Sequence, residues 1–395
     1  MHETLRTPTR MDQVQAPIIP VIGRMIREVP GTISLGQGVV HYGPPPEVNE
    51  AVRAALARPS IYQYHDGAGL PALLDRIARK LSAENGIDAS QGSRIMVTAG
   101  ANMAFVHAVL SITSPGDEVI LPVPFYFNHE MAIEMAGCRA LRVPTDDHYQ
   151  LRLDAIRTAI TSRTRAIVTI SPNNPSGAVL SEASLREVNV LCRERGLYHV
   201  ADEPYEYFTY GSARHVSPGS FPGAAAHTIS MYSLSKAYGF AGWRIGYVVY
   251  PEHLESAMMK SQDTILICPT IASQEAAIAA LDVGRAHCAP HVRALAEIRD
   301  SVVATLSELG ALATVPAADG AFYCLLRVHT AMASLALAER LIREHKVAVI
   351  PGTAFGMLDG CYFRVAYGAL QKETVAEGVG RLVDGLRQIL KSSDS

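Results

Sequence analysis

A lysine and an arginine lie eight positions apart in the segment SLSKAYGFAGWRIG, residues 233–246, at Lys236 and Arg244. The segment begins at the end of a short apolar run, HTISMYS, which is typical of a buried strand. A lysine at a strand end is usually a surface residue, but a lysine that loses its proton forms covalent bonds with carbonyl compounds. An arginine binds phosphate and carboxylate groups through its planar fork of donors. Which chemistry needs both cations depends on the loops that surround them.

Four other loops with small, aromatic or polar residues also follow apolar runs: AGAN (99–102), VPFYF (123–127), SPNNPSG (171–177) and DEPYEYF (202–208). Small residues that open a helix, as in AGAN, let backbone N–H groups approach an anion. The aromatic loop offers rings for stacking, and Asp202 follows its strand directly. Each feature alone is explained by a turn, a cap or ordinary packing. Together with Lys236 they describe a pocket for a flat, phosphorylated aldehyde with a cationic ring, and pyridoxal phosphate is such a compound.

These loops belong to a repeating pattern that starts at about residue 94, in which short β-rich runs alternate with longer amphipathic segments. The pattern predicts βαβ units in a mostly parallel sheet, and the continuous apolar runs indicate that helices cover both faces. Ligands of such open sheets bind beyond the carboxyl ends of the strands, where the five loops lie. We therefore predict an α/β fold with a doubly wound large domain over residues 46–288. An N-terminal arm with part of the small domain precedes it over residues 1–45, and a smaller α+β domain follows over residues 289–395.

The composition excludes several classes of protein. The chain of 395 residues has a formal net charge of −3 and lacks the basic stripe of a nucleic-acid-binding surface. No apolar stretch approaches the roughly 18 residues of a membrane-spanning helix, and the segment 16–22 is too short and proline-broken for a signal peptide. The six cysteines have no metal-ligand spacing and are typical of free thiols in a reducing compartment. We expect a cytoplasmic protein without a metal site, a membrane contact or a nucleic-acid partner.

Six motifs resemble, in the same order, those of the class I/II aminotransferases, which are pyridoxal-phosphate enzymes of fold type I. The motifs are LGQG (35–38), YHDGAGLPAL (64–73), NNPSG (173–177), DEPY (202–205), SLSKAYGFAGWRIG (233–246) and FRVAYG (363–368). Asp202 stands 34 residues before Lys236, and Arg364 stands 128 residues after it. Each motif alone is weak, but their order and spacing are specific. The resemblance runs from about Leu35 to the C-terminus.

The resemblance implies a catalytic role for three residues. Lys236 is expected to form a Schiff base with the cofactor aldehyde and, once freed, to move the substrate proton. Asp202 is expected to keep the pyridine nitrogen protonated, since opposite charges about 4 Å apart attract by roughly 4 kcal/mol at an effective dielectric of about 20. Tyr205 and Asn174 match the residues that hydrogen-bond the phenolic oxygen of the cofactor.

The phosphate of the cofactor is expected among hydroxyl, backbone and guanidinium donors. The resemblance assigns this role to Ser233, Ser235, Arg244, Gly100, Ala101 and Asn102. Tyr126 matches the aromatic residue that stacks on the cofactor ring, with Phe125 or Phe127 as alternatives. Two glycines, Gly242 and Gly246, are expected to let the chain double back closely.

The resemblance also implies a substrate side and a partner. Arg364 matches the arginine that binds the substrate α-carboxylate, which suits its planar fork. Gly38 and Asn174 match residues beside the same carboxylate. Tyr64 matches a tyrosine that reaches the phosphate of a neighbouring subunit, which implies a homodimer with shared active sites.

Members of the family that act on dicarboxylates need a second cation for the distal carboxylate. Some members carry a lysine at the position matched by Asn102, and others use an arginine of the partner from a region that corresponds to residues 261–283. In this chain position 102 is asparagine, and residues 261–283 contain no lysine or arginine. Burying an unpaired carboxylate is costly. We therefore expect a ping-pong reaction between a 2-oxo acid and an L-amino acid that is neutral or aromatic rather than aspartate. His41 and Tyr42 either line the side-chain pocket or are ordinary loop residues.

Three alternatives stay open. A pyridoxal-phosphate carbon–sulfur β-lyase shares the cofactor and most of these residues, and releases pyruvate and ammonia from cysteine thioethers. A cofactor-sensing transcription regulator also uses this fold, but it needs a DNA-binding domain for which the segment before residue 35 is too short. A scaffold without turnover has no need of the set Lys236, Asp202 and Arg364.

Overall fold

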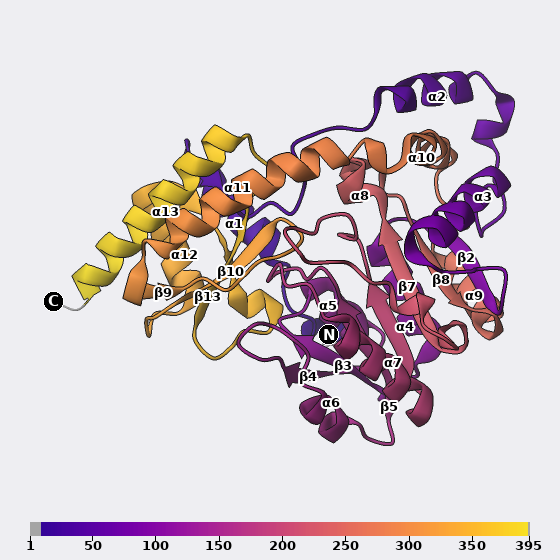
Figure 1. Ribbon diagram of the computed structural model, residues 1–395, viewed down its shortest axis with the longest axis horizontal. Coiled ribbons are helices and arrows are strands. Elements are labelled where there is room, and N and C mark those ends of the chain that lie inside the picture. The colour runs from indigo at the N-terminus through magenta and orange to yellow at the C-terminus, as the bar shows by residue number, and fades with distance from the viewer. Residues whose placement is uncertain (1–8, 394–395) are drawn as a thin grey trace, which may run out of the picture.

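The computed structural model describes residues 9–393, so the first eight residues of the predicted N-terminal arm lie outside the described part. A seven-stranded sheet forms the centre of the molecule, with strand order β2-β8-β7-β6-β5-β3-β4 (Figure 1). Its strands are β2 (Ser93–Thr98), β3 (Glu118–Val123), β4 (Arg139–Pro144), β5 (Thr164–Ile170), β6 (Tyr198–Asp202), β7 (Thr228–Ser233) and β8 (Gly246–Pro251). All neighbouring pairs are parallel except those of β8, which is antiparallel to β2 and β7.

Helices cover both faces of this sheet, as the apolar strands require. On β3, Val119 and Leu121 face one buried cluster with α4 (Ala101–Ile112), α5 (Phe127–Met135) and α9 (Glu255–Ile265), whereas Ile120 faces another. The opposite face packs against α3 (Pro71–Lys80), α6 (Leu153–Ala159), α7 (Glu182–Arg195) and α10 (Ile271–Val283). The short helix α8 (Leu234–Ala237) directly follows β7. Successive strand residues thus point alternately into the buried layers on the two faces of the sheet.

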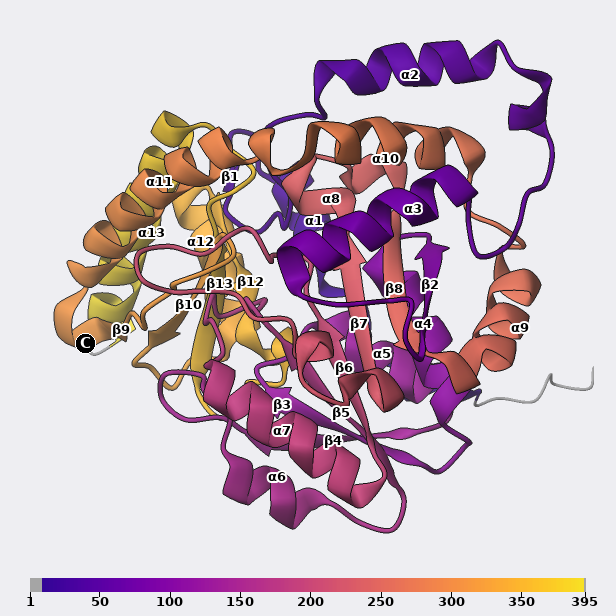
Figure 2. The same cartoon turned by 45° about the vertical axis from the view of Figure 1, so that its right-hand side comes forward.

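A second, four-stranded antiparallel sheet has the order β12-β13-β10-β9. Its strands are β9 (Ala313–Thr314), β10 (Tyr323–Val328), β12 (Ile350–Pro351) and β13 (Cys361–Ala366), and it packs with α11 (Ala289–Ser307), α12 (Ser334–His345) and α13 (Lys372–Ser393). Figure 2 shows α11 and α13 side by side, apart from the large sheet. The two sheets and their helices confirm the predicted fold class.

The N-terminal part of the described chain packs against its C-terminal part. β1 (Ile33–Ser34) pairs in parallel with β11 (Val347–Ala348), and α1 (Ile18–Glu28) packs against α12 and β12. α2 (Pro46–Leu56) then crosses to the large sheet and lies along α10 (Figure 1). Residues 347–348 and 350–351 lie close in sequence but belong to two different sheets.

The six cysteines are free, and five of them are buried. Among residues 9–393 no helix is long and apolar enough to cross a membrane.

Candidate active site

A cavity lies where the carboxyl ends of β5, β6 and β7 meet the N-terminus of α4 and the small sheet. Of the residues predicted for the site, those that line it are Gly38, Ala101, Asn102, Tyr126, Asn174, Asp202, Tyr205, Ser233, Ser235, Lys236, Arg244 and Arg364. Gly100 lies immediately behind the lining, and Tyr64 is 78% exposed and lies elsewhere. The fold therefore gathers side chains that are up to 326 positions apart, from Gly38 to Arg364.

Lys236 reaches the cavity from α8, one short turn beyond strand β7. Its Nζ donates a hydrogen bond of 2.6 Å to the carbonyl of Gly38. Burial lowers the pKa of Lys236 to about 8, and the positive charges of Arg364 and Arg244 act in the same direction, against the opposing effect of Asp202. The amine therefore loses its proton far more readily than an ordinary lysine, whose pKa is about 10.4.

Asp202 is the last residue of β6 and is 4% exposed. Its Oδ2 lies 3.1 Å from Nε2 of His129, which is itself buried and stacks on Phe105 at a centroid distance of 4.1 Å. The other carboxylate oxygen, Oδ1, has no hydrogen-bond partner among the described residues. Since an unpaired buried carboxylate oxygen is costly, this atom requires a donor that the chain does not supply.

Backbone and side-chain donors gather at the start of α4. Gly100 precedes the helix with a φ of +79°, and no side chain caps the first free N–H groups. A Cβ at position 100 would stand 2.7 Å from Nη2 of Arg244, so only glycine leaves room for the guanidinium there. Arg244 itself adopts a left-handed φ of +50°, and within residues 9–393 its guanidinium donates to the carbonyls of Ala241 and Ala99 alone. This corner of the cavity is built for an anion.

Two serines stand across from this helix terminus. Ser233 begins α8 and its hydroxyl accepts a hydrogen bond of 3.2 Å from the backbone N–H of Ser235. Gly246, at the start of β8, is close enough that a Cβ would stand 2.5 Å from the carbonyl of Tyr232. Gly242 differs from its prediction, because a Cβ there would meet nothing within 4 Å. Close approach thus depends on Gly246 and not on Gly242.

Arg364 enters from β13 of the small sheet and is 2% exposed. Its Nη1 donates to Oδ1 of Asn174 at 2.9 Å and its Nη2 to the carbonyl of Gly36 at 2.7 Å. The guanidinium carbon lies 4.8 Å from the centroid of the Tyr323 ring and 5.1 Å from that of Phe355. No ion pair among the described residues involves Arg364, and its Nε lacks a partner. A buried guanidinium without a carboxylate is ready for an anion from outside.

A hydrogen bond between two tyrosines connects the sheets. The hydroxyl of Tyr205, from the loop after β6, lies 2.9 Å from that of Tyr323 on β10, and Asn174 Nδ2 lies 3.5 Å from Tyr205. Burial raises the pKa of Tyr323 to about 12 and also raises the pKa of Tyr205 well above its usual value. Both hydroxyls therefore stay protonated at neutral pH and act as hydrogen-bond donors and acceptors.

The three candidate residues for stacking on the cofactor ring, all in the aromatic loop, have different surroundings. Tyr126 and Phe127 line the cavity, whereas Phe125 is 1% exposed and packs in the core against Gly356. The Tyr126 hydroxyl accepts a hydrogen bond of 2.9 Å from Asn128. Phe125 is therefore excluded as the stacking residue, and Tyr126 stays the prediction with Phe127 as its alternative.

His41 and Tyr42 lie outside the lining of the cavity. Tyr42 donates a hydrogen bond of 3.0 Å to the carbonyl of Lys236, and its ring stacks on His291 at 3.7 Å. Of the two alternatives for this pair, their positions favour ordinary loop residues over a lining of the side-chain pocket. Tyr42 instead contacts the backbone that carries the lysine.

Several side chains in or beside the cavity were not predicted from the sequence. His129 follows the aromatic loop in a helix, Tyr323 lies in an apolar strand, and Ile19 lies in an amphipathic helix near the start of the chain. Each has the pattern of an ordinary core residue, so its type and spacing give no signal of a site.

Comparison with known proteins agrees with this geometry. Residues 30–382 match the family described as "Aminotransferase class I and II". The aromatic aminotransferase ISS1 of Arabidopsis thaliana is 34% identical over 95% of this chain and 94% of its own length. An aspartate aminotransferase of Pyrococcus abyssi is 33% identical over 96% and 98% of the two chains.

The crystal structure of an aromatic aminotransferase from Pyrococcus horikoshii superposes with a TM-score of 0.86 at 33% identity, over 93% of this chain and 99% of that one. The similarity covers both sheets and all six motifs. The chain therefore belongs to the aminotransferase class I and II family, and it is an aminotransferase.

Proposed function

We propose that this aminotransferase moves an amino group between an L-amino acid with a neutral or aromatic side chain and a 2-oxo acid, in two half-reactions that use pyridoxal phosphate. The observation that carries the proposal is the environment of Lys236. Its pKa is lowered to about 8 in a cavity that also holds the unpaired Oδ1 of Asp202. A nucleophilic amine and a free buried carboxylate oxygen in one pocket suit a cationic ring aldehyde.

The residues of the cavity fit the cofactor that the family uses. Asp202 Oδ1 needs a donor, and the protonated ring nitrogen of pyridoxal phosphate is such a donor. The N-terminus of α4 and Arg244 suit the phosphate, with Ser233 and Ser235 beside them. When bound, the cofactor supplies a reactive aldehyde and a ring that withdraws electrons.

The chain's own groups then divide the work. Lys236 binds the aldehyde and, through its Nζ, accepts and returns the proton of the substrate Cα. Asp202, which His129 holds by the hydrogen bond to Oδ2, keeps the ring nitrogen protonated. Tyr205, with Asn174 and Tyr323 as partners, orients the ring through its hydroxyl. Because an amine with a pKa near 8 is partly neutral at pH 7, the base is available at physiological pH.

The charges of the cavity support a substrate without a second carboxylate. Three cations line it: Lys236, Arg244 and Arg364. The first is assigned to the aldehyde, the second to the phosphate and the third to the α-carboxylate, so none of them remains for a distal carboxylate. Ile19 and Phe127 add apolar surface to the lining. An aromatic or neutral side chain is buried there at no electrostatic cost.

We further propose a homodimer in which Tyr64 serves the site of the partner. Tyr64 is 78% exposed and Tyr62 nearby is 76% exposed, so both rings are accessible to a second copy of the chain. The adjacent Gly67 packs against the carbonyl of Ile267, and Ile265 and Ile267 are also exposed. Sedimentation velocity should give twice the mass of one chain, and a monomer that is fully active would contradict this assignment.

A panel of amino acids tests the substrate assignment. Holoenzyme is mixed with one amino acid at a time, without a 2-oxo acid, and the loss of the cofactor's absorbance in a single turnover is recorded. We expect tyrosine, phenylalanine or aliphatic amino acids to react faster than aspartate. Equal or faster reaction of aspartate would contradict the proposal. Release of pyruvate and ammonia from a cysteine thioether without an acceptor would establish the β-lyase instead.

A further inference from the structure

A buried polar network lies on the far side of the loop that presents Asp202 and Tyr205. The pairing of β6 with its neighbours ends at Asp202, which is opposite Ile170 and Met231. Beyond that point, the side chains of the loop point to two different sides. Asp202 and Tyr205 line the cavity, whereas Glu203 and Glu206 point into the network.

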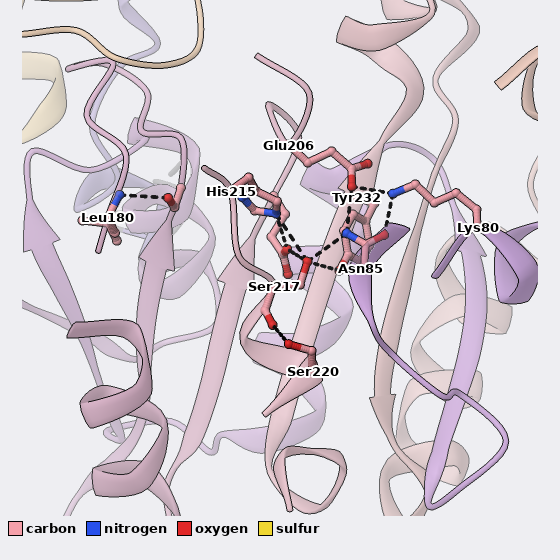
Figure 3. Close-up of polar contacts among 10 residues, drawn as sticks. Lys80, Asn85, Leu180, Glu206, His215, Ser217, Ser220 and Tyr232 are labelled. Carbon is pink, nitrogen blue, oxygen red and sulfur yellow. Dashed lines mark hydrogen bonds and ion pairs between the residues drawn. The ribbon is translucent and has the colours of Figure 1, made fainter. Parts of the chain in front are cut away.

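The network is centred on one lysine and one asparagine (Figure 3). Lys80, the last residue of α3, contacts Glu206 in an ion pair and donates to Oδ1 of Asn85 at 2.8 Å. Asn85 Nδ2 in turn donates to Glu206 at 2.9 Å and to the hydroxyl of Ser217 at 2.8 Å. The side chains of the ion pair are 8% and 12% exposed, so water hardly screens it.

The second carboxylate is connected through Ser217. Its hydroxyl donates to Oε2 of Glu203, which also lies 2.9 Å from Nε2 of His215. The hydroxyl of Tyr232 donates to Ser217 at 3.2 Å, and its ring lies 4.8 Å from Lys80 Nζ. Tyr232 directly precedes Ser233, so the network also contacts the strand that leads to Lys236.

The two carboxylates have different partners, because Lys80 pairs with Glu206 and His215 contacts Glu203. Tyr207 donates to a third carboxylate, Glu84, and lies between Lys80 and Arg285, whose centre is 5.5 Å from the ring. Oε1 of Glu203 and Nδ1 of His215 have no partner among the described residues.

Ser217, His215 and Glu203 do not form a hydrolytic site. The same nitrogen of His215, Nε2, lies 2.9 Å from the carboxylate and 3.3 Å from the serine, whereas a catalytic triad uses both ring nitrogens. Ser217 is also 3% exposed, and no substrate reaches it. The cluster therefore acts through the loop and not by chemistry of its own.

We propose that Lys80, Asn85, Glu203, Glu206 and Ser217 form a positioning network that holds the Asp202–Tyr205 loop against the cofactor. Its value lies in position more than in stability, because a buried ion pair often contributes little net free energy of folding. The N–H of Glu203 still donates to the carbonyl of Met231 at 2.8 Å, and the network then fixes the side chains of Glu203 and Glu206 just beyond the last residue pair of the ladder. The inference rests on the proposed roles of Asp202 and Tyr205.

The test uses holoenzyme and three variants: Lys80→Met, Glu206→Gln and the double variant that carries both. The measurements are the dissociation constant of the cofactor and the pH midpoint of the absorbance of the bound cofactor. We expect each single variant to weaken cofactor binding by about tenfold and to shift the midpoint by about half a unit. The double variant removes both charges, and the amide oxygen that it introduces in place of the Glu206 carboxylate still accepts from Asn85. It should therefore lie closer to wild type than either single variant.

Arg76→Met is the matched control, because Arg76 lies one turn earlier on α3 and pairs with Asp282 at the surface. It should change neither measurement. If Lys80→Met does not fold, Ser217→Ala serves in its place, with a smaller shift in the same direction. Folded single variants that lose thermal stability but keep the wild-type midpoint and cofactor affinity would overturn the proposal. That failure differs from failure of the proposed function, in which wild type itself would bind no cofactor at Lys236.

Discussion

The two arginines of the cavity come from different sheets and are held in different ways. Arg364 stands on β13 of the small sheet, is 2% exposed, and is fixed by Asn174, by the Gly36 carbonyl and by two aromatic faces. Arg244 lies in the connection between β7 and β8 of the large sheet and has a left-handed backbone conformation. Its guanidinium donates hydrogen bonds to two backbone carbonyls. Arg364 is therefore fixed before a ligand binds. Most N–H donors of the Arg244 guanidinium, in contrast, have no partner among the described residues.

This difference separates the anions that the two sides receive. A preorganised planar fork suits a substrate carboxylate that binds and leaves in every turnover, because little side-chain entropy is lost each time. A less constrained arginine beside a helix N-terminus suits a phosphate that stays bound, because backbone N–H groups share the work. Changes on the small-sheet side should therefore alter substrate kinetics, and changes on the large-sheet side should alter cofactor binding.

The largest effect is expected from Arg364→Met. Loss of one partner of a buried, hydrogen-bonded charge pair costs about 2–5 kcal/mol, which corresponds to a fall in kcat/KM of about 30- to 5,000-fold. Cofactor affinity should stay at the wild-type value. Arg327→Met, an exposed arginine on the neighbouring strand β10, is the control. Weakened cofactor binding in Arg364→Met would break the division between the two sides.

Arg244→Met should show the opposite pattern. A hydrogen bond to a charged group contributes about 1.5–3 kcal/mol, so the dissociation constant of the cofactor should rise by about 10- to 150-fold. At saturating cofactor, KM for the amino acid should change little. Gly100→Ala sharpens this test, since its Cβ would press on the guanidinium from 2.7 Å. Arg94→Met, on the exposed surface of β2, should leave both constants unchanged.

Tyr323→Phe probes the contact between the two sides. It removes the hydroxyl that meets Tyr205 at 2.9 Å, a hydrogen bond with a net contribution of about 0.5–1.5 kcal/mol. We expect kcat/KM to fall by about two- to tenfold, together with a small change in the pH midpoint of the cofactor absorbance. Tyr149→Phe, a buried tyrosine outside this cavity, is the control. A change in KM alone would place Tyr323 on the substrate side only.

Asn102→Lys should give the smallest change and alter substrate choice. A partly exposed charge pair contributes up to about 1 kcal/mol, so the ratio of kcat/KM for aspartate to that for an aromatic amino acid should rise by about fivefold. Asn102→Gln adds length without charge and should leave the ratio unchanged. A ratio that does not move with lysine would mean that the side chain of the substrate does not reach this position.

The sequence predicts the parts of the site that lie at strand ends. Lys236, Asp202 and Asn174 each follow an apolar strand, and parallel strands bring such loops to one edge. Residues that depend on the packing of two sheets or helices gave no signal. His129 reaches Asp202 only because α5 packs behind β6, and Tyr323 reaches Tyr205 only because the small sheet closes over the large one. Gly242 is an opposite case, because the motif predicted a close approach of the chain there and the structure has open space around it.

The central claim is that one amine, Lys236, binds the cofactor covalently opposite the free oxygen of Asp202. Reduction of the holoenzyme with borohydride, followed by digestion and mass spectrometry, tests it most directly. The account predicts the added mass of a reduced pyridoxal phosphate on the peptide that contains Lys236, and no added mass in Lys236→Ala. The same added mass on a different lysine, or on none in a protein that still turns over, would contradict it.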